Sequence, residues 1–88
     1  MYQIALSEIA DMDIDYWKKS GQKNIQNKIS QLLKDIQEHP YTGLGKPEAL
    51  RYNLSGKYSR RINQEHRIVY EVDEIQQLVI IHSLKGHY

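Results

Sequence analysis

The sequence predicts an α+β fold in which an N-terminal strand and an antiparallel helix hairpin pack on a mainly antiparallel sheet. Three observations predict it. Residues 2–6 alternate with period two, residues 8–38 carry two segments of helical periodicity, and period two returns from residue 49 onward. Helices that precede a run of strands in this way are typical of domains whose helices cover one face of the sheet. We expect residues 1–88 to form a single domain.

The first two elements follow from short patterns. In residues 2–6, Tyr2, Ile4 and Leu6 alternate with smaller or polar side chains, which predicts a strand. Ser7 is a good N-cap for the helix that follows. In this helix, apolar side chains recur at helical spacing: Ile9, Met12 and Tyr16, with Trp17 beside them. The helix is expected to end near Gly21, since glycine accepts the left-handed conformation of a C-terminal cap.

The second helix has the strongest periodicity of the chain. Its apolar positions are Ile25, Ile29, Leu32, Leu33 and Ile36. They form one stripe, and polar residues fill the remaining positions. The pair His39-Pro40 is expected to end the helix, because the residue before proline is disfavoured in the α region. The short connection at Gly21 predicts that the two helices run antiparallel.

From Ala49 onward the pattern predicts strands at residues 50–52, 58–63, 67–72 and 77–82. Turns are expected at Ser55-Gly56 and Asp73-Glu74. The last strand is apolar on both faces and is therefore expected to be central in the sheet and covered on both sides.

Composition excludes several classes of protein. The 88 residues contain no cysteine, so disulfides, thiolate metal sites and cysteine nucleophiles are absent. No apolar run approaches the about 18 residues of a membrane span. The N-terminus also lacks the basic and apolar regions of a signal peptide. We therefore expect a cytoplasmic protein that does not bind a membrane.

The four histidines and the serines give weak signals for chemistry. His39, His66, His82 and His87 lack the spacing of metal ligands on one helix, so no metal or other cofactor is expected. Ser55 is not part of a nucleophile elbow, because the Gly-x-Ser-x-Gly pattern is missing.

Residues 43–70 carry an excess of positive charge. This stretch contains six basic residues and only two acidic ones, although the net charge of the chain is just +1. The basic residues are Lys46, Arg51, Lys57, Arg60, Arg61 and Arg67, and the acidic ones are Glu48 and Glu65. Tyrosines are interleaved with them, as on surfaces that meet phosphates and bases. A solvated strand face would show a similar charge pattern, but the lone Glu48 within the basic stretch favours a functional site.

These residue types suit cleavage of RNA without a metal. Attack by a 2′-hydroxyl on the adjacent phosphate needs a base, an acid and cations against the developing charge. Glu48 or His87 could transfer protons, and Tyr88 could stack on a base or donate its hydroxyl. The phosphate could be held by Lys46, Arg60, Arg61 and Arg67. Two other classes stay open: a non-catalytic RNA- or ribosome-binding module, and a structural partner of another protein.

Several ordered motifs resemble the Txe/YoeB family of bacterial toxins, within the wider RelE-like group. They are Gly45-Lys46-Pro47-Glu48-Ala49-Leu50, Asn53-Leu54-Ser55-Gly56, Ser59-Arg60-Arg61-Ile62, Glu65-His66-Arg67-Ile68-Val69-Tyr70 and His87-Tyr88. The resemblance covers essentially the whole chain. Gly86, just before the last motif, departs from the family pattern and predicts a loose tail.

The resemblance implies a RelE-like fold and a toxin of a type II toxin–antitoxin pair. Such a toxin is a ribosome-dependent endoribonuclease that cuts messenger RNA in the A site. By this resemblance Glu48 is the general base, Arg67 stabilises the phosphate, His87 is the general acid and Tyr88 completes the site. Lys46, Arg60 and Arg61 correspond to positions that contact RNA. Glu48 and His87 could exchange roles.

The resemblance also implies partners. They are a YefM/Phd-like antitoxin, the ribosome with its messenger, and a second copy of the chain in a homodimer.

Overall fold

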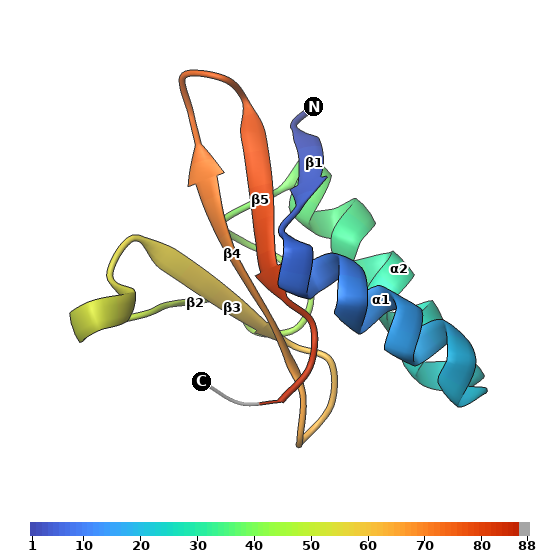
Figure 1. Ribbon diagram of the computed structural model, residues 1–88. Helices are drawn as coiled ribbons and strands as arrows, with labels where there is room; N and C mark the ends of the chain where they lie inside the picture. Colours follow the sequence, from blue (N-terminus) through green and yellow to red (C-terminus); the bar gives the residue numbers. More distant parts are fainter. Residues whose placement is uncertain (87–88) are drawn as a thin grey trace.

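A computed structural model describes residues 1–86 and shows two helices packed on one face of a five-stranded mixed sheet (Figure 1). The elements in chain order are β1 (Gln3–Leu6), α1 (Glu8–Ser20), α2 (Lys23–Glu38), β2 (Glu48–Ala49), a short 3₁₀ helix η1 (Tyr52–Leu54), β3 (Lys57–Arg61), β4 (Arg67–Asp73) and β5 (Leu78–Ser83). The predicted α+β class is confirmed. Neither helix of residues 1–86 is long and apolar enough to cross a membrane.

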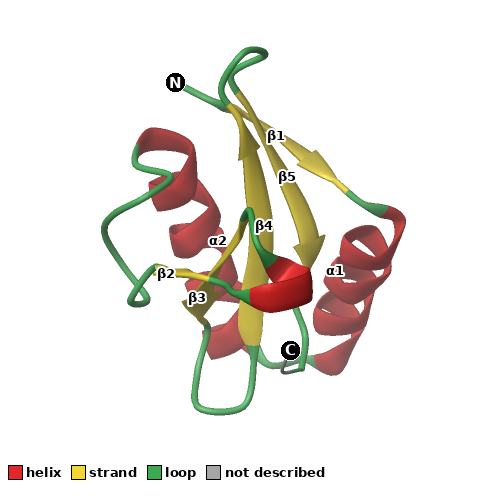
Figure 2. Cartoon of the chain, turned by 90° about the vertical axis from the view of Figure 1, so that its left-hand side faces the viewer, coloured by secondary structure: helices red, strands yellow, loops and turns green. Residues whose placement is uncertain are grey.

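The strands lie in the order β1-β5-β4-β3-β2, and Figure 2 shows the sheet with the helices behind it. β1 runs parallel to β5, from Gln3 opposite Leu78 to Leu6 opposite Ile81. The other neighbouring strands are antiparallel. The apolar strand β5 therefore lies between β1 and β4, inside the sheet as expected. Within the described residues the two helices pack on only one of its faces, so the expected cover on both sides is wrong.

One predicted strand is wrong. Residues 50–52 were expected to be extended, but β2 ends at Ala49 and η1 begins at Tyr52. The backbone of Tyr52 has φ of 59°, in the left-handed region, which a strand does not allow. β2 is consequently a short edge strand, and it contains Glu48.

Helix α1 begins and ends as predicted. Ser7 Oγ accepts a hydrogen bond from Ala10 N at 3.0 Å, and Gly21 closes the helix with φ of 72°. Its buried face differs from the expected one, because Ala10 and Trp17 are in the core. Three predicted apolar positions remain exposed: Ile9 at 61%, Met12 at 66% and Tyr16 at 47%.

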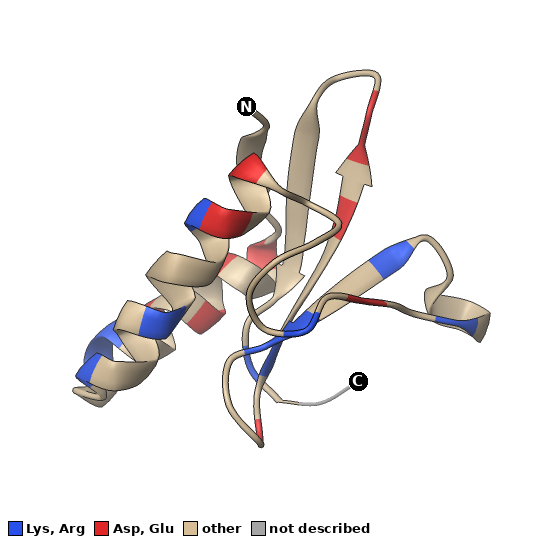
Figure 3. Ribbon diagram, turned by 180° about the vertical axis from the view of Figure 1, so that it is seen from behind, with Lys and Arg blue, Asp and Glu red and all other residues tan. Residues whose placement is uncertain are grey.

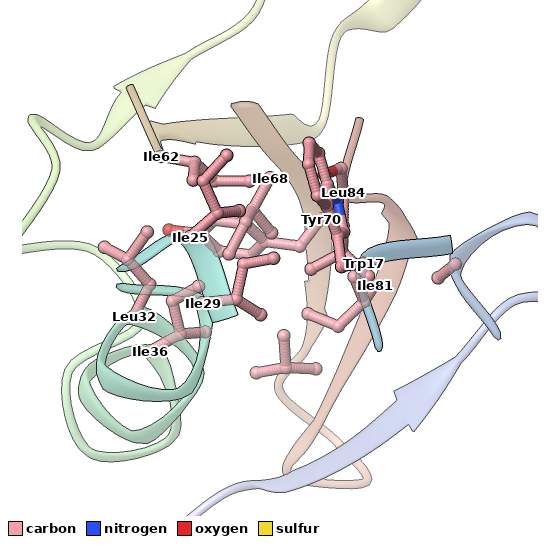
Figure 4. Packing of buried hydrophobic residues seen from close by; sticks show 12 residues of the cluster. Trp17, Ile25, Ile29, Leu32, Ile36, Ile62, Ile68, Tyr70, Ile81 and Leu84 are labelled. Atoms are coloured by element: carbon pink, nitrogen blue, oxygen red, sulfur yellow. The ribbon is translucent and has the colours of Figure 1, made fainter. Parts of the chain in front are cut away.

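The core lies between the helices and the sheet (Figure 4). Helix α2 buries its predicted stripe of Ile25, Ile29, Leu32 and Ile36, while Leu33 is partly buried. The sheet contributes alternate residues of β4 and β5, including Ile68, Tyr70, Val79 and Ile81. Because side chains alternate along a strand, the residues between them face away from the helices. This second face of the sheet, opposite the helices, is called the open face below.

Candidate active site

The register of the sheet brings three predicted site residues together on the open face. Glu48 of β2 lies opposite Ser59 of β3, and two residues farther along β3, Arg61 lies opposite Arg67 of β4. Directly opposed residues have Cβ atoms about 5 Å apart, and diagonal neighbours about 7–8 Å. Glu48, Arg61 and Arg67 therefore lie within reach of one small substrate group. Figure 3 shows basic segments of β3 and β4 crossing beside the acidic segment of β2.

Arg61 and Arg67 form an opposed pair of like charges. Like charges directly opposite one another destabilise a sheet. An anion held between the two side chains would reverse the sign of that interaction. Arg61 is exposed, whereas Arg67 is partly buried with its Nη1 below the surface. The pair therefore forms a suitable site for a phosphate.

Lys46 lies at the edge of the same face. Its side chain is exposed, and the chain just before it is fixed by a 2.7 Å hydrogen bond from Arg61 N to Gly45 O. Lys46 and Arg61 line a depression of about 330 Å³ together with Lys28 of α2. Lys28 was not predictable from the sequence, because its position beside the loop depends on how α2 packs on the sheet. A third cation at this edge extends the basic surface beyond the open face.

Arg60 does not belong among the predicted RNA-binding residues. Its side chain is 0% exposed and lies on the helix-facing side of β3. All three of its nitrogens donate hydrogen bonds: Nη1 to Asp35 Oδ2 (2.5 Å) and Leu44 O (3.1 Å), Nη2 to Thr42 O (2.8 Å) and His39 O, and Nε to Tyr70 Oη (3.1 Å). A buried guanidinium with these partners is not available to RNA. The prediction that Arg60 binds RNA is therefore wrong.

The bonds of Arg60 build the loop that leads to Glu48. Three backbone carbonyls of residues 39–44 accept from the guanidinium, and Asp35 Oδ2 also accepts from Leu44 N at 3.0 Å. Tyr70 Oη donates to Pro40 O at 2.7 Å. The loop is thus wrapped around one buried cation. We call Arg60, Asp35 and Tyr70 the loop cage.

The loop cage favours the ionised form of the Asp35 carboxyl. Partial burial opposes the charged form, but hydrogen bonds from Arg60 and Leu44 N, with the positive charge of Arg60, outweigh burial. The pKa of the Asp35 carboxyl is consequently below its ordinary value. Burial raises the pKa of the Tyr70 hydroxyl, although Arg60 opposes this shift. At neutral pH the cage therefore contains a carboxylate, a guanidinium and a neutral phenol.

Residues 84–86, after β5, are held at several points. Leu84 is buried, its N donates to Asp13 Oδ2 at 2.9 Å, and its O accepts from Trp17 Nε1 at 2.9 Å. Gly86 N donates to His66 Nδ1 at 2.8 Å, and Gly86 O accepts from Arg67 N at 3.2 Å. The chain is thus anchored up to Gly86, while the expected looseness of the tail concerns His87 and stays a prediction. His87 and Tyr88 lie outside the described residues, and their catalytic roles stay predictions.

The opposite end of the open face has compensated charges. Lys57 of β3 lies opposite Glu71 of β4, and Glu71 Oε1 lies 2.5 Å from His82 Nε2 of β5. This end therefore offers little excess charge to an anion. Within residues 1–86, no group of three or more histidine or acidic side chains could hold a metal ion.

The class of the protein follows from the fold. The structure matches a "YoeB/ParE toxin from Agrobacterium tumefaciens" with a TM-score of 0.92 and 31% identity, over 98% of this chain and 99% of that one. It matches a chain of a "YoeB-YefM complex from Staphylococcus aureus" with a TM-score of 0.86 and 44% identity, over 100% of this chain and 99% of that one. The fold is that of the RelE-like toxins.

Sequence comparison defines the family. Residues 7–88 match the model of the YoeB-like toxin of bacterial type II toxin–antitoxin systems. The chain is 45% identical over 76 residues to "Toxin YoeB" of Escherichia coli (strain K12), which covers 86% of this chain and 87% of that protein. This chain therefore belongs to the YoeB-like toxin family.

Proposed function

We propose that this chain is a ribosome-dependent endoribonuclease that cleaves messenger RNA in the A site and so inhibits translation. The observation that carries the proposal is the register that places Glu48, Arg61 and Arg67 on one open face of the sheet. The hydrogen bond between Arg67 N and Gly86 O adds the position from which His87 and Tyr88 continue. Membership of the YoeB-like toxin family supports the same activity.

The proposed reaction is an internal transfer at one phosphate. Glu48 takes the proton of the 2′-hydroxyl while the 2′-oxygen bonds to phosphorus. The bond from phosphorus to the 5′-oxygen breaks, and His87 donates a proton to that oxygen. The products are a 2′,3′-cyclic phosphate and a free 5′-hydroxyl.

The cations act on the charge of the transition state. Arg67 and Arg61 stabilise the added negative charge on the phosphorane oxygens, and Arg67 can use two donors of its planar guanidinium. Lys46 binds a flanking phosphate as a point charge. Tyr88 stacks on a base or donates its hydroxyl. All these groups come from this chain, so the scheme needs no metal ion.

The ribosome supplies positioning in this proposal. Glu48, Lys46 and Arg61 are exposed on an open face, and a flexible messenger would sample many geometries there. A ribosome that holds the A-site codon in one conformation lowers the entropic cost of the reaction. The free protein should therefore cut naked RNA poorly. Equal rates on naked and ribosome-bound messenger would refute this dependence.

The proposed partner is a YefM-like antitoxin. Solved relatives from Staphylococcus aureus are a YoeB–YefM complex, a heterotetrameric form of it and a YoeB dimer. For this chain we propose an antitoxin with an acidic or extended segment that covers Arg61 and Arg67, because a basic segment would be repelled there. A homodimer of this chain is proposed on the same likeness. An inhibitory complex that leaves Arg61 and Arg67 open would contradict the proposed covering.

The test uses purified ribosomes programmed with a defined messenger, and the 5′ ends of the fragments are mapped. Glu48→Gln keeps the size of the side chain but cannot act as a base, and we expect cleavage to fall by a factor of about 10² or more. Glu38→Gln is the matched control, since Glu38 is an exposed carboxylate at the end of α2. It should cut at the wild-type rate. A wild-type chain that binds programmed ribosomes but cuts nothing would favour a non-catalytic ribosome-binding module.

A further inference from the structure

We propose that His66 is a positioning residue that fixes the backbone of Gly86, the residue directly before His87. This inference rests on the proposed function in one respect, the catalytic use of His87. The contact that carries it is the 2.8 Å hydrogen bond from Gly86 N to His66 Nδ1. His66 lies in the connection between β3 and β4, twenty residues before Gly86 along the chain.

The hydrogen bond defines the state of the His66 ring. Nδ1 accepts from a backbone N–H, so it carries no proton, and the neutral ring has its proton on Nε2. Nε2 lies 3.9 Å from Glu65 Oε2, too far for a hydrogen bond, and a neutral ring forms no ion pair there. His66 therefore acts through its acceptor nitrogen.

The His66 ring is itself held by helix α1. It packs edge-to-face on Trp17, with ring centroids 4.9 Å apart and an angle of 81° between the planes. Trp17 Nε1 at the same time donates to Leu84 O at 2.9 Å. One tryptophan thus orients His66 and anchors the chain two residues before Gly86.

Helix α1 provides two further anchors on the same side. Asp13, Tyr16 and Trp17 are spaced so that they share one helix face. Asp13 Oδ2 accepts from Leu84 N at 2.9 Å, and Lys85 Nζ lies 3.9 Å from the centroid of the Tyr16 ring. The three consecutive residues 84–86 are therefore each fixed by a different side chain.

Gly86 completes the arrangement through its backbone conformation. Its φ is 81°, in the left-handed region that favours glycine, although a Cβ at this position would meet no atom within 4 Å. The glycine is thus required for the turn of the backbone and not for space. In this conformation Gly86 N meets His66 Nδ1 and Gly86 O meets Arg67 N, which ties the tail to the strand that carries the proposed phosphate ligand.

Two substitutions of His66 separate positioning from packing. His66→Phe keeps an aromatic ring against Trp17 and removes the acceptor. His66→Asn removes the ring, but its Oδ1 branches from the same carbon position as Nδ1 and can accept from Gly86 N. We expect His66→Phe to melt close to the wild type and His66→Asn to melt lower, because only the asparagine loses the aromatic contact.

The two variants should rank the other way round in their rates of messenger cleavage on programmed ribosomes. We expect kcat of His66→Phe to fall by between about tenfold and a hundredfold, because displacement of a reacting group by about 1 Å costs this much. Its KM for programmed ribosomes should stay at the wild-type value, since the cations of the open face are intact. His66→Asn should keep most of kcat. If kcat instead follows the order of melting temperatures, or if His66→Phe cuts like the wild type, the positioning role is refuted.

Two further measurements test the proposal if His66→Phe does not fold or if the chain shows no cleavage activity. Should His66→Phe fail to fold, Asp13→Ala removes the acceptor of Leu84 N from a partly buried position in the middle of α1 and should lower kcat in the same way at unchanged KM. Hydrogen exchange of the Gly86 amide is independent of activity: it should be slow in the wild type and in His66→Asn, and fast in His66→Phe. An unprotected Gly86 amide in the wild type would refute the tether. A protected amide in a wild-type chain that never cuts RNA would refute the proposed function and the catalytic use of the tether, while the tether itself would stand.

Discussion

Arg60 and Arg61 are neighbours on β3, yet they belong to two different regions of the molecule. Arg60 faces the helices and is fully buried. It donates to Asp35 and Tyr70, the other members of the loop cage, and to three carbonyls of residues 39–44. Arg61 faces away from the helices, is exposed and lies opposite Arg67. The same kind of side chain therefore has two roles: Arg60 holds the scaffold together on one face of the sheet, and Arg61 forms part of the proposed phosphate site on the other.

The comparison shows that a basic residue has to be assigned to a face before it is assigned a function. Burial of Arg60 is compatible with folding because each of its nitrogens has a hydrogen-bond acceptor. On the open face Arg61 is exposed, Arg67 is partly buried, and their like charges lie opposite one another. We expect the buried, hydrogen-bonded cation to matter for stability, and the opposed cations of the open face to matter for binding and catalysis. The predictions below test that division.

The largest effect is expected for Arg60→Ala. Removing this side chain leaves Asp35 and the carbonyls of the loop without their donor, and loss of one partner of a buried ion pair costs about 3–5 kcal/mol. Arg61→Ala should change the free energy of unfolding by no more than about 0.5 kcal/mol. Urea denaturation of both variants measures this difference. Equal stability of the two variants would abolish the proposed division between the faces.

The second effect concerns the terminal pair. A chain that lacks His87 and Tyr88 keeps the anchors of residues 84–86, so folding and antitoxin binding should survive. Cleavage on programmed ribosomes should fall by a factor of about 10² or more, the scale of one lost general acid. His87→Gln should reproduce most of this loss. Cleavage at the wild-type rate by the shortened chain would show that the assigned acid is wrong.

A smaller effect is expected from pH on the loop cage. The pKa of Asp35 is lower in the folded chain than the ordinary value of 3.8, so its ionisation stabilises the fold above that pH. The contribution is lost as the pH falls through the lowered pKa of the folded state. Asp35→Asn should therefore be less stable than the wild type near neutrality, and the difference should shrink below about pH 4. Urea denaturation across this range is the measurement, with exposed Asp15→Asn as the control. A difference that stays constant down to pH 3 would contradict the role of the Asp35 charge.

Much of the fold was predictable because it follows from local periodicity. The stripe of α2, the cap at Ser7 and the apolar β5 each depend on residues close together in the sequence. The buried face of α1 was not predictable in the same way. Apolar residues occupy more than one side of this helix, and packing on the sheet selects the side with Ala10 and Trp17.

The two arginines of β3 contained a usable signal. Tyr58, Arg60 and Ile62 share one parity, and two of these three residues are apolar or aromatic, which indicates the buried face. Arg61 has the opposite parity. Strand alternation alone could therefore have removed Arg60 from the RNA-binding set. The unexpected feature is that a charged residue occupies the buried side, and this requires the acceptors supplied by Asp35 and the loop.

The anchors of residues 84–86 had no comparable signal. Asp13 and Trp17 meet Leu84 across 71 and 67 residues of sequence, and these contacts exist only because α1 packs beside the end of β5. Lys28 joins the basic edge for a similar reason. Sequence patterns predict the buried face of an element with one clear apolar stripe, such as α2, while contacts between distant elements depend on the tertiary structure.

The most direct test of the division between scaffold and site is the single-turnover cleavage rate of Arg67→Lys on programmed ribosomes, with the free energy of unfolding measured on the same sample. The variant keeps the positive charge but loses the planar fork that can hold two phosphate oxygens. We expect the cleavage rate to fall about a hundredfold while the free energy of unfolding stays near the wild-type value. Wild-type cleavage, or a variant that loses cleavage only because it unfolds, would contradict the assignment of Arg67 to the catalytic face.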